Sequence, residues 1–116
     1  MLFVGYTKCS TSNKAQKWLD ATGVAYEFRS IKEKPPTVEE LSRWQQQSGL
    51  PLKRFFNTSG LLYKAQGLKD KLPAMTAQEQ LTLLASDGML VKRPILVGED
   101  FVLVGFKEAE WEEKCK

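Results

Sequence analysis

Hydrophobic and polar positions follow strand and helix periods in turn along the first part of the chain. An apolar run at 2–5 predicts a short buried strand. Apolar residues then recur three and four positions apart, which predicts a helix from about residue 10 to the glycine at 23. Alternation at 24–31 predicts a second strand. Together these segments predict a right-handed βαβ unit with parallel strands.

The middle of the chain has no strand pattern and predicts a helical insert at about 37–88. Lys34-Pro35-Pro36 interrupts the preceding strand. Two capping boxes, beginning at Thr37 and Thr76, predict the first turns of two helices. The helices predicted within the insert are 37–48, 51–56, 63–66, 69–72 and 76–86.

Strand character returns after the insert, at 94–97 and 101–104. The Gly98-Glu99-Asp100 segment between them predicts an antiparallel hairpin, and a terminal helix follows. The order βαβ, helical insert, ββα predicts an α/β, thioredoxin-like fold with a mixed four-stranded sheet. We expect a single domain over 1–116, because the chain has no linker long enough to separate two domains.

Composition narrows the classes of function. The chain is 42% hydrophobic and 27% charged, as folded domains are, and no apolar run approaches the ~20 residues of a membrane span. The N-terminus does not resemble a signal peptide, so we expect a cytoplasmic protein with no membrane partner. A net charge of +3 without a dense basic cluster argues against direct nucleic-acid binding. With no histidine and two cysteines, neither Cys-His catalysis nor a metal site is expected.

Cys9 stands where the first strand is expected to end and the first helix to begin. Unpaired helix N–H groups and the helix dipole favour a thiolate there, and Lys8 and Lys14 add positive charge. We therefore predict that Cys9 is a reactive nucleophile; the alternative is a small buried hydrophobic residue. The second cysteine, Cys115, lies among Glu and Lys residues and is expected to be an exposed thiol.

Lys92-Arg93-Pro94 precedes the third strand. A proline that opens a strand loses little by its missing N–H, and in thioredoxin-like folds the proline at this place is cis and faces the reactive cysteine. We expect Pro94 to be cis. Arg93 is then either an anion-binding residue or an ordinary surface ion-pair residue.

From residue 3 to residue 111 the chain resembles the arsenate-reductase-like (ArsC/Spx) family. Within that family it is most similar to a small bacterial branch with a Cys-x-x-Ser motif. The motifs that carry the resemblance are Lys8-Cys9-Ser10-Thr11-Ser12, Lys34-Pro35-Pro36, Phe55-Phe56-Asn57-Thr58-Ser59-Gly60 and Val91-Lys92-Arg93-Pro94.

The resemblance implies a thiol-dependent oxidoreductase with Cys9 as its nucleophile. Cys9 would attack a small oxyanion or a disulfide, and glutathione, another low-molecular-weight thiol or a glutaredoxin would resolve the intermediate. No bound cofactor is implied. Arg93 would stabilise the negative charge of the substrate.

Ser12 completes the predicted catalytic set of Cys9, Ser12 and Arg93. Its hydroxyl can donate to the Cys9 thiolate or cap the helix, and the two roles are compatible. The resemblance and the expected backbone geometry give the substrate-binding residues as Ser10, Thr11, Asn57, Arg93 and Pro94.

Two departures from the family pattern bear on the substrate. Arsenate-reducing members use two further arginines, which fall here at Asn57 and near Phe106, where Lys107 is the nearest cation. Since each charged hydrogen bond contributes roughly 1.5–3 kcal/mol, the affinity for arsenate should be lower. Ser12 also replaces the second cysteine of the Spx regulators, so their internal disulfide switch is not expected.

Two other functions stay open at this point. One is a regulator like Spx that binds RNA polymerase, with Gly49 at a turn where Spx places a contact glycine; Gly49 would alternatively end a helix. The other is a redox-inactive member that keeps only the fold.

Overall fold

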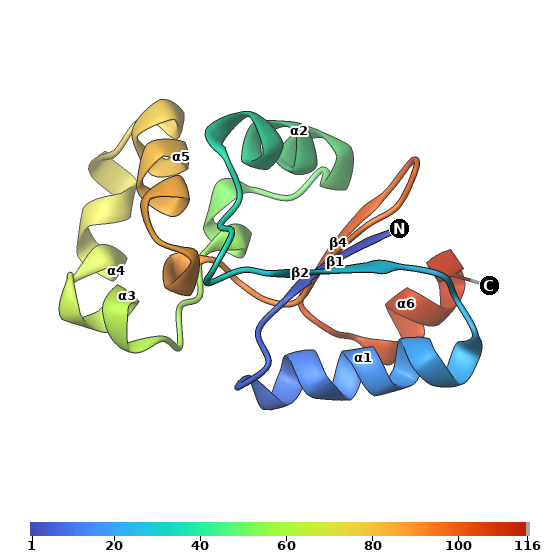
Figure 1. Cartoon of the computed structure of the whole chain (residues 1–116). Helices are drawn as coiled ribbons and strands as arrows, with labels where there is room; N and C mark the ends of the chain where they lie inside the picture. Colours follow the sequence, from blue (N-terminus) through green and yellow to red (C-terminus); the bar gives the residue numbers. More distant parts are fainter. Residues whose placement is uncertain (116) are drawn as a thin grey trace.

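A four-stranded mixed sheet lies between two helical layers in the computed structural model, which describes residues 1–115 (Figure 1). The strand order is β2-β1-β3-β4. β1 is parallel to β2 and antiparallel to β3, and β3 is antiparallel to β4. This confirms the predicted α/β, thioredoxin-like fold. In chain order the elements are β1 (Leu2–Gly5), α1 (Ser10–Thr22), β2 (Glu27–Ser30), α2 (Val38–Ser48), η1 (Leu52–Phe55), α3 (Leu61–Ala65), α4 (Leu68–Lys71), η2 (Leu72–Ala74), α5 (Ala77–Ser86), η3 (Gly88–Leu90), β3 (Ile95–Val97), β4 (Val102–Val104) and α6 (Glu108–Cys115).

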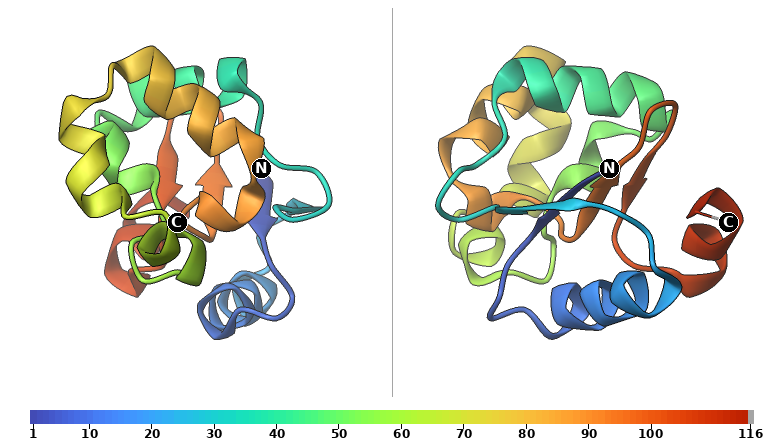
Figure 2. Two further views of the ribbon diagram at one scale, coloured as in Figure 1. Left: turned by 90° about the vertical axis from the view of Figure 1, so that its left-hand side faces the viewer. Right: turned by 45° about the vertical axis from the view of Figure 1, so that its right-hand side comes forward.

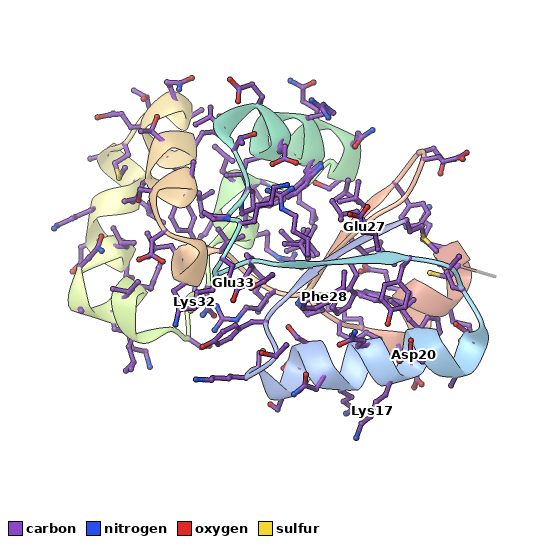
Figure 3. The ribbon with its side chains drawn as sticks, viewed as in Figure 1. Lys17, Asp20, Glu27, Phe28, Lys32 and Glu33 are labelled. Atoms are coloured by element: carbon purple, nitrogen blue, oxygen red, sulfur yellow. The ribbon has the colours of Figure 1, made fainter. Side chains whose placement is uncertain are left out.

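The sheet is buried on both faces because side chains alternate along each strand. Phe3, Leu96 and Leu103 are aligned across three strands and pack under α1 and α6. Figure 3 shows Phe28 between β2 and α1, while Lys17 points away from the sheet. On the opposite face, apolar residues of β1, β3 and β4 pack against the insert (Figure 2). The insert therefore shares a core with the sheet.

Most element boundaries match the predictions, and the second strand is the main exception. It was predicted over 24–31 and spans only Glu27–Ser30. β2 pairs only with β1, and the first pair of that register joins Glu27 to Leu2, so the three residues before Glu27 have no neighbouring strand. Within residues 1–115, no helix combines the length and apolar character that crossing a bilayer requires.

Arg29 ties β2 to the start of the insert. Its guanidinium makes a bidentate ion pair with Glu40, with N–O distances of 2.7 and 2.9 Å. It also donates to the carbonyl oxygens of Lys34 and Pro35. Glu40 is at the same time the N3 residue that completes the capping box opening at Thr37. The Glu40 carboxylate therefore caps the start of α2 and also joins this helix to β2 of the sheet.

We expect Glu40→Gln to lower the free energy of unfolding by about 2 kcal/mol, the contribution of a charged hydrogen-bond pair. The reason is that the Arg29 side chain, 12% exposed, would lose its counter-charge. Urea denaturation at neutral pH measures the change. Glu39→Gln, at an exposed neighbour on the same turn, is the control and should change stability by no more than about 0.5 kcal/mol.

The same pair predicts acid sensitivity. The hydrogen bonds from Arg29 lower the pKa of Glu40 from 4.5 to about 2, against the opposing effect of burial. A carboxyl whose folded-state pKa is depressed stabilises the fold above its unfolded pKa. This contribution is therefore complete above about pH 4.5 and is lost as the pH falls toward 2. Equal acid sensitivity of the wild type and Glu40→Gln would contradict the assignment.

Candidate active site

Cys9 lies directly before α1, as the sequence predicts. It occupies the N-cap position with an extended backbone, φ −101° and ψ 121°. Its N–H donates to the Tyr6 carbonyl oxygen at 3.0 Å, and its carbonyl oxygen accepts from Asn13 at 3.0 Å. No side chain caps the helix start. The first N–H groups of α1 therefore have no side-chain acceptor, and they are available to stabilise negative charge at the start of the helix, where Cys9 lies.

Ser12 lies beneath Cys9 on the buried side of α1, in line with Ala15 and Leu19. It is 1% exposed, and its Oγ accepts a hydrogen bond of 3.2 Å from the N–H of Tyr6. Because that bond occupies a lone pair of the oxygen, the hydroxyl proton is free to be donated to the Cys9 sulfur.

The surroundings of Cys9 favour the thiolate. Burial alone would raise the pKa of the Cys9 thiol. The Ser12 N–H and hydroxyl, the Arg93 guanidinium and the Thr11 N–H are donors close to the sulfur that favour the thiolate more than burial disfavours it, so the pKa lies below its ordinary value of 9.0. The thiolate fraction at neutral pH is correspondingly larger than that of an isolated cysteine.

Arg93 approaches Cys9 from the segment before β3. The Arg93–Pro94 peptide bond is cis, as expected. The half-buried guanidinium makes a long 3.5 Å bond to the Met89 carbonyl oxygen and lies 5.4 Å from the centre of the Tyr6 ring. Within residues 1–115, Arg93 has no carboxylate partner at ion-pair distance. Among the described residues Arg93 therefore makes no ordinary surface ion pair, and its role in anion binding stays a prediction.

A cavity of 620 Å³ opens beside Cys9. We call it the cationic cavity, because five of its lining side chains are positively charged and none of the described residues that line it is acidic. The isolated bridge between Phe56 and Val91, with a 2.7 Å bond from the Lys92 N–H to the Phe55 carbonyl oxygen, holds two of its walls together. The cationic cavity is lined by Cys9 and by Lys53, Arg54, Lys92, Arg93 and Lys107.

The structure brings together most of the residues that the sequence analysis selected. Thr11 and Asn57 line the cationic cavity with Cys9 and Arg93, whereas Ser12 and Pro94 are buried and do not line it. Ser10 is exposed at the first position of α1 and does not line the cavity.

Three cavity cations were not selected from the sequence: Lys53, Arg54 and Lys92. Lys53 and Arg54 lie on η1, just before the Phe55–Gly60 motif, and Lys92 directly precedes Arg93. Lys53 and Arg54 lie next to one motif and Lys92 lies within another, and this was the signal that could have identified them.

The expectation for Cys115 is wrong. It is half-buried at the last residue of α6 and packs against the cluster around Trp111, because the helix continues to this residue with its apolar side facing the sheet. Burial raises the pKa of the Cys115 thiol. Within the described part of the chain, no group of three or more His, Cys, Asp or Glu side chains is placed to hold a metal ion.

We expect Arg93→Gln to raise the pKa of Cys9 and to slow its reaction with disulfides at neutral pH by about tenfold, the equivalent of a charged hydrogen bond of about 1.5 kcal/mol. Thiolate absorbance against pH measures the first effect and stopped-flow kinetics the second. Arg43→Gln, at an exposed position on α2, is the control and should change neither. An unchanged thiol titration in Arg93→Gln would show that the guanidinium does not act on the sulfur.

The fold and the site define a thioredoxin-like protein with one cysteine at the start of its first helix, beside a cis Arg-Pro step. The chain belongs to the ArsC family, whose sequence model matches residues 4–114. This confirms the resemblance drawn from the motifs.

The proteins similar to this chain include both arsenate reductases and transcriptional regulators. YusI, an uncharacterized protein of Bacillus subtilis, is 50% identical over 97% of this chain and 96% of its own length. The global transcriptional regulator Spx 2 of Oceanobacillus iheyensis is 32% identical over 86% of this chain and 73% of the regulator. The crystal structure of an ArsC-family-related protein from Bacteroides fragilis has a TM-score of 0.94 at 56% identity, covering 97% of this chain and 94% of that one. An arsenate reductase from Vibrio cholerae has a TM-score of 0.83 at 28% identity, covering 100% and 98%.

Proposed function

We propose that this protein is a thiol-dependent oxidoreductase of the arsenate-reductase type, with Cys9 as its nucleophile. The observation that carries the proposal is the position of Cys9: at an uncapped helix start, with a lowered pKa, on the wall of a cavity lined by cations. A thiolate in such a place can attack an electrophile, and the cations stabilise the negative charge of the incoming group.

With a disulfide, the Cys9 sulfur bonds to one sulfur of the substrate, and the other leaves as a thiolate. An external thiol then attacks the mixed disulfide and restores Cys9. With arsenate, the attack forms an arsenic–sulfur bond and releases one oxygen as water. Two external thiols then supply the two electrons that give arsenite, and they leave joined as a disulfide. Both routes require an outside thiol, because Ser12 stands where a resolving cysteine would be.

In this proposal Ser12 and the Thr11 N–H hold the thiolate, while Arg93 binds the charge of the substrate. Asn57 and Thr11 line the binding cavity, and Pro94 is buried next to Arg93 in the sequence. Ser10 would contribute only its backbone N–H, since its exposed side chain does not line the cavity.

A second function, binding to RNA polymerase, is favoured by one observation, the 32% identity to Spx 2. The structure gives Gly49 a separate role: it ends α2 with φ +69° and donates to the Gln45 carbonyl oxygen at 3.1 Å. Since that geometry accounts for the glycine, it does not support a polymerase contact. Polymerase pull-down with wild type and Cys9→Ser tests the alternative, and capture independent of Cys9 without thiol transfer would favour it.

Mass spectrometry of the intact protein tests the redox proposal. The protein is exposed in turn to arsenate, glutathione disulfide and peroxide, and the modified residue is then located by digestion. We expect an adduct at Cys9 that a low-molecular-weight thiol removes. Absence of any adduct at Cys9 with all three reagents would rule the proposal out.

A further inference from the structure

The cationic cavity is larger than a tetrahedral oxyanion needs. Its volume of 620 Å³ equals the volume that about twenty water molecules occupy in liquid water, whereas a tetrahedral oxyanion displaces only a few water molecules. Pockets of roughly 300–1,000 Å³ enclose organic ligands of many atoms. The size of the cavity therefore indicates a substrate with substantial groups attached to its reacting atom.

The charges of the cavity come from three separate parts of the chain. Lys53 and Arg54 lie on η1, Lys92 and Arg93 precede β3, and Lys107 follows β4. None of these five side chains forms an ion pair with a carboxylate of residues 1–115. The salt bridge found among those residues joins Arg29 to Glu40, which do not line the cavity. Like charges gathered around one space repel each other, and a ligand with several negative charges relieves that repulsion.

We propose that the cationic cavity takes a low-molecular-weight disulfide that carries several negative charges. This inference rests on the proposed function of Cys9. The Cys9 thiolate bonds to one sulfur of the disulfide, the S–S bond breaks, and its electron pair leaves with the other sulfur as a thiolate. A second low-molecular-weight thiol then attacks the mixed disulfide and returns Cys9 to its thiol form. The charged groups of the substrate lie against Lys53 and Lys107 of the cavity wall.

The test compares three disulfides of different charge: coenzyme A disulfide, which is polyanionic, 2-hydroxyethyl disulfide, which is neutral, and cystamine, which is cationic. The rate of Cys9 adduct formation is measured by mass spectrometry. Each rate is divided by that of the same disulfide with free 2-mercaptoethanol, a thiol without a fixed charge, which removes differences in intrinsic reactivity. We expect the normalised rate to be at least about tenfold higher for the polyanion than for the neutral disulfide at low salt, and lowest for cystamine.

Salt and charge reversal then separate attraction from other effects. At about 1 M salt, where the Debye length is about 3 Å, the preference for the polyanion should fall to within about twofold. The variant Lys53→Glu/Lys107→Glu should lower the ratio of polyanion to neutral rates by about tenfold or more at low salt. Lys69→Glu/Lys71→Glu makes the same change of charge on α4, where neither side chain lines the cavity, and should keep the ratio within about twofold of wild type.

The outcomes distinguish this inference from the function on which it rests. Equal normalised rates for the three disulfides, or equal losses in the two double variants, would overturn the polyanion proposal and leave Cys9 as a thiol nucleophile. Failure of all three disulfides to modify Cys9 would overturn the polyanion proposal, and the reactions with arsenate and peroxide described above would then decide whether Cys9 is a nucleophile. Circular dichroism of each double variant verifies that the comparison is made between folded proteins.

Discussion

Cys9→Ser is expected to abolish the formation of every mixed disulfide and to leave the fold intact. The serine hydroxyl stays protonated at neutral pH and cannot exchange with a disulfide. Cys9 is only half-buried and precedes α1, so the smaller oxygen leaves no cavity in the core. The free energy of unfolding should change by no more than about 0.5 kcal/mol. Intact-mass spectrometry after disulfide treatment, together with urea denaturation, measures both results.

Cys115→Ser is the matched control. Cys115 is the second free cysteine of the chain, and its burial on α6 raises the pKa of its thiol, so it should contribute little to the reaction. We expect Cys115→Ser to form the Cys9 adduct at the wild-type rate. Adduct formation that persists in Cys9→Ser and disappears in Cys115→Ser would show that Cys115 is the nucleophile and would contradict the proposal.

Gly88→Ala is expected to lower the free energy of unfolding by about 3 kcal/mol, near the upper end for overpacked sites. Gly88 begins η3 where the insert returns to the sheet. A Cβ at this position would lie 2.7 Å from the carbonyl carbon of Ile31 and would overlap its oxygen. Both are main-chain atoms next to β2, so neither can move aside as a flexible side chain would. Urea denaturation measures the loss.

The same substitution should also affect the site. The Met89 carbonyl oxygen, one residue after Gly88, accepts from Arg93, so a displaced η3 moves the acceptor that positions the guanidinium. Gly67→Ala is the control: Gly67 has φ +62° and open space around its Cα, and an alanine there should cost only about 1–2 kcal/mol. Equal losses in the two variants would show that close backbone contact is not what Gly88 provides.

Local signals account for the parts of the fold that the sequence predicted well. The capping boxes at Thr37 and Thr76 are both formed, because each depends on residues three positions apart. Gly23 ends α1 with φ +77°, as its place after an apolar period indicated. The length of β2 was overestimated because strand ends depend on the partner strand, which alternation within one segment does not report.

The candidate site was predictable at its centre and not at its rim. Cys9, Arg93 and Asn57 belong to recognisable motifs, and the structure places all three at one cavity. Lys53 and Arg54 carry no motif of their own. They reach the cavity only because Phe56 bridges to Val91, a contact between segments far apart in the chain. Such a contact is set by tertiary packing, which no local pattern specifies.

The aromatic cluster between α1 and α6 contains tryptophans whose intrinsic fluorescence can report on the cationic cavity. Phe106 lines the cationic cavity and lies against both Trp18 and Trp111, with ring centres 6.2 and 5.0 Å apart. The indole N–H of Trp111 donates to the carbonyl oxygen of Gly105, another residue of the cavity wall. A molecule that enters the cavity therefore changes the surroundings of two fluorophores, and its arrival and departure can be followed by intrinsic fluorescence, without a dye.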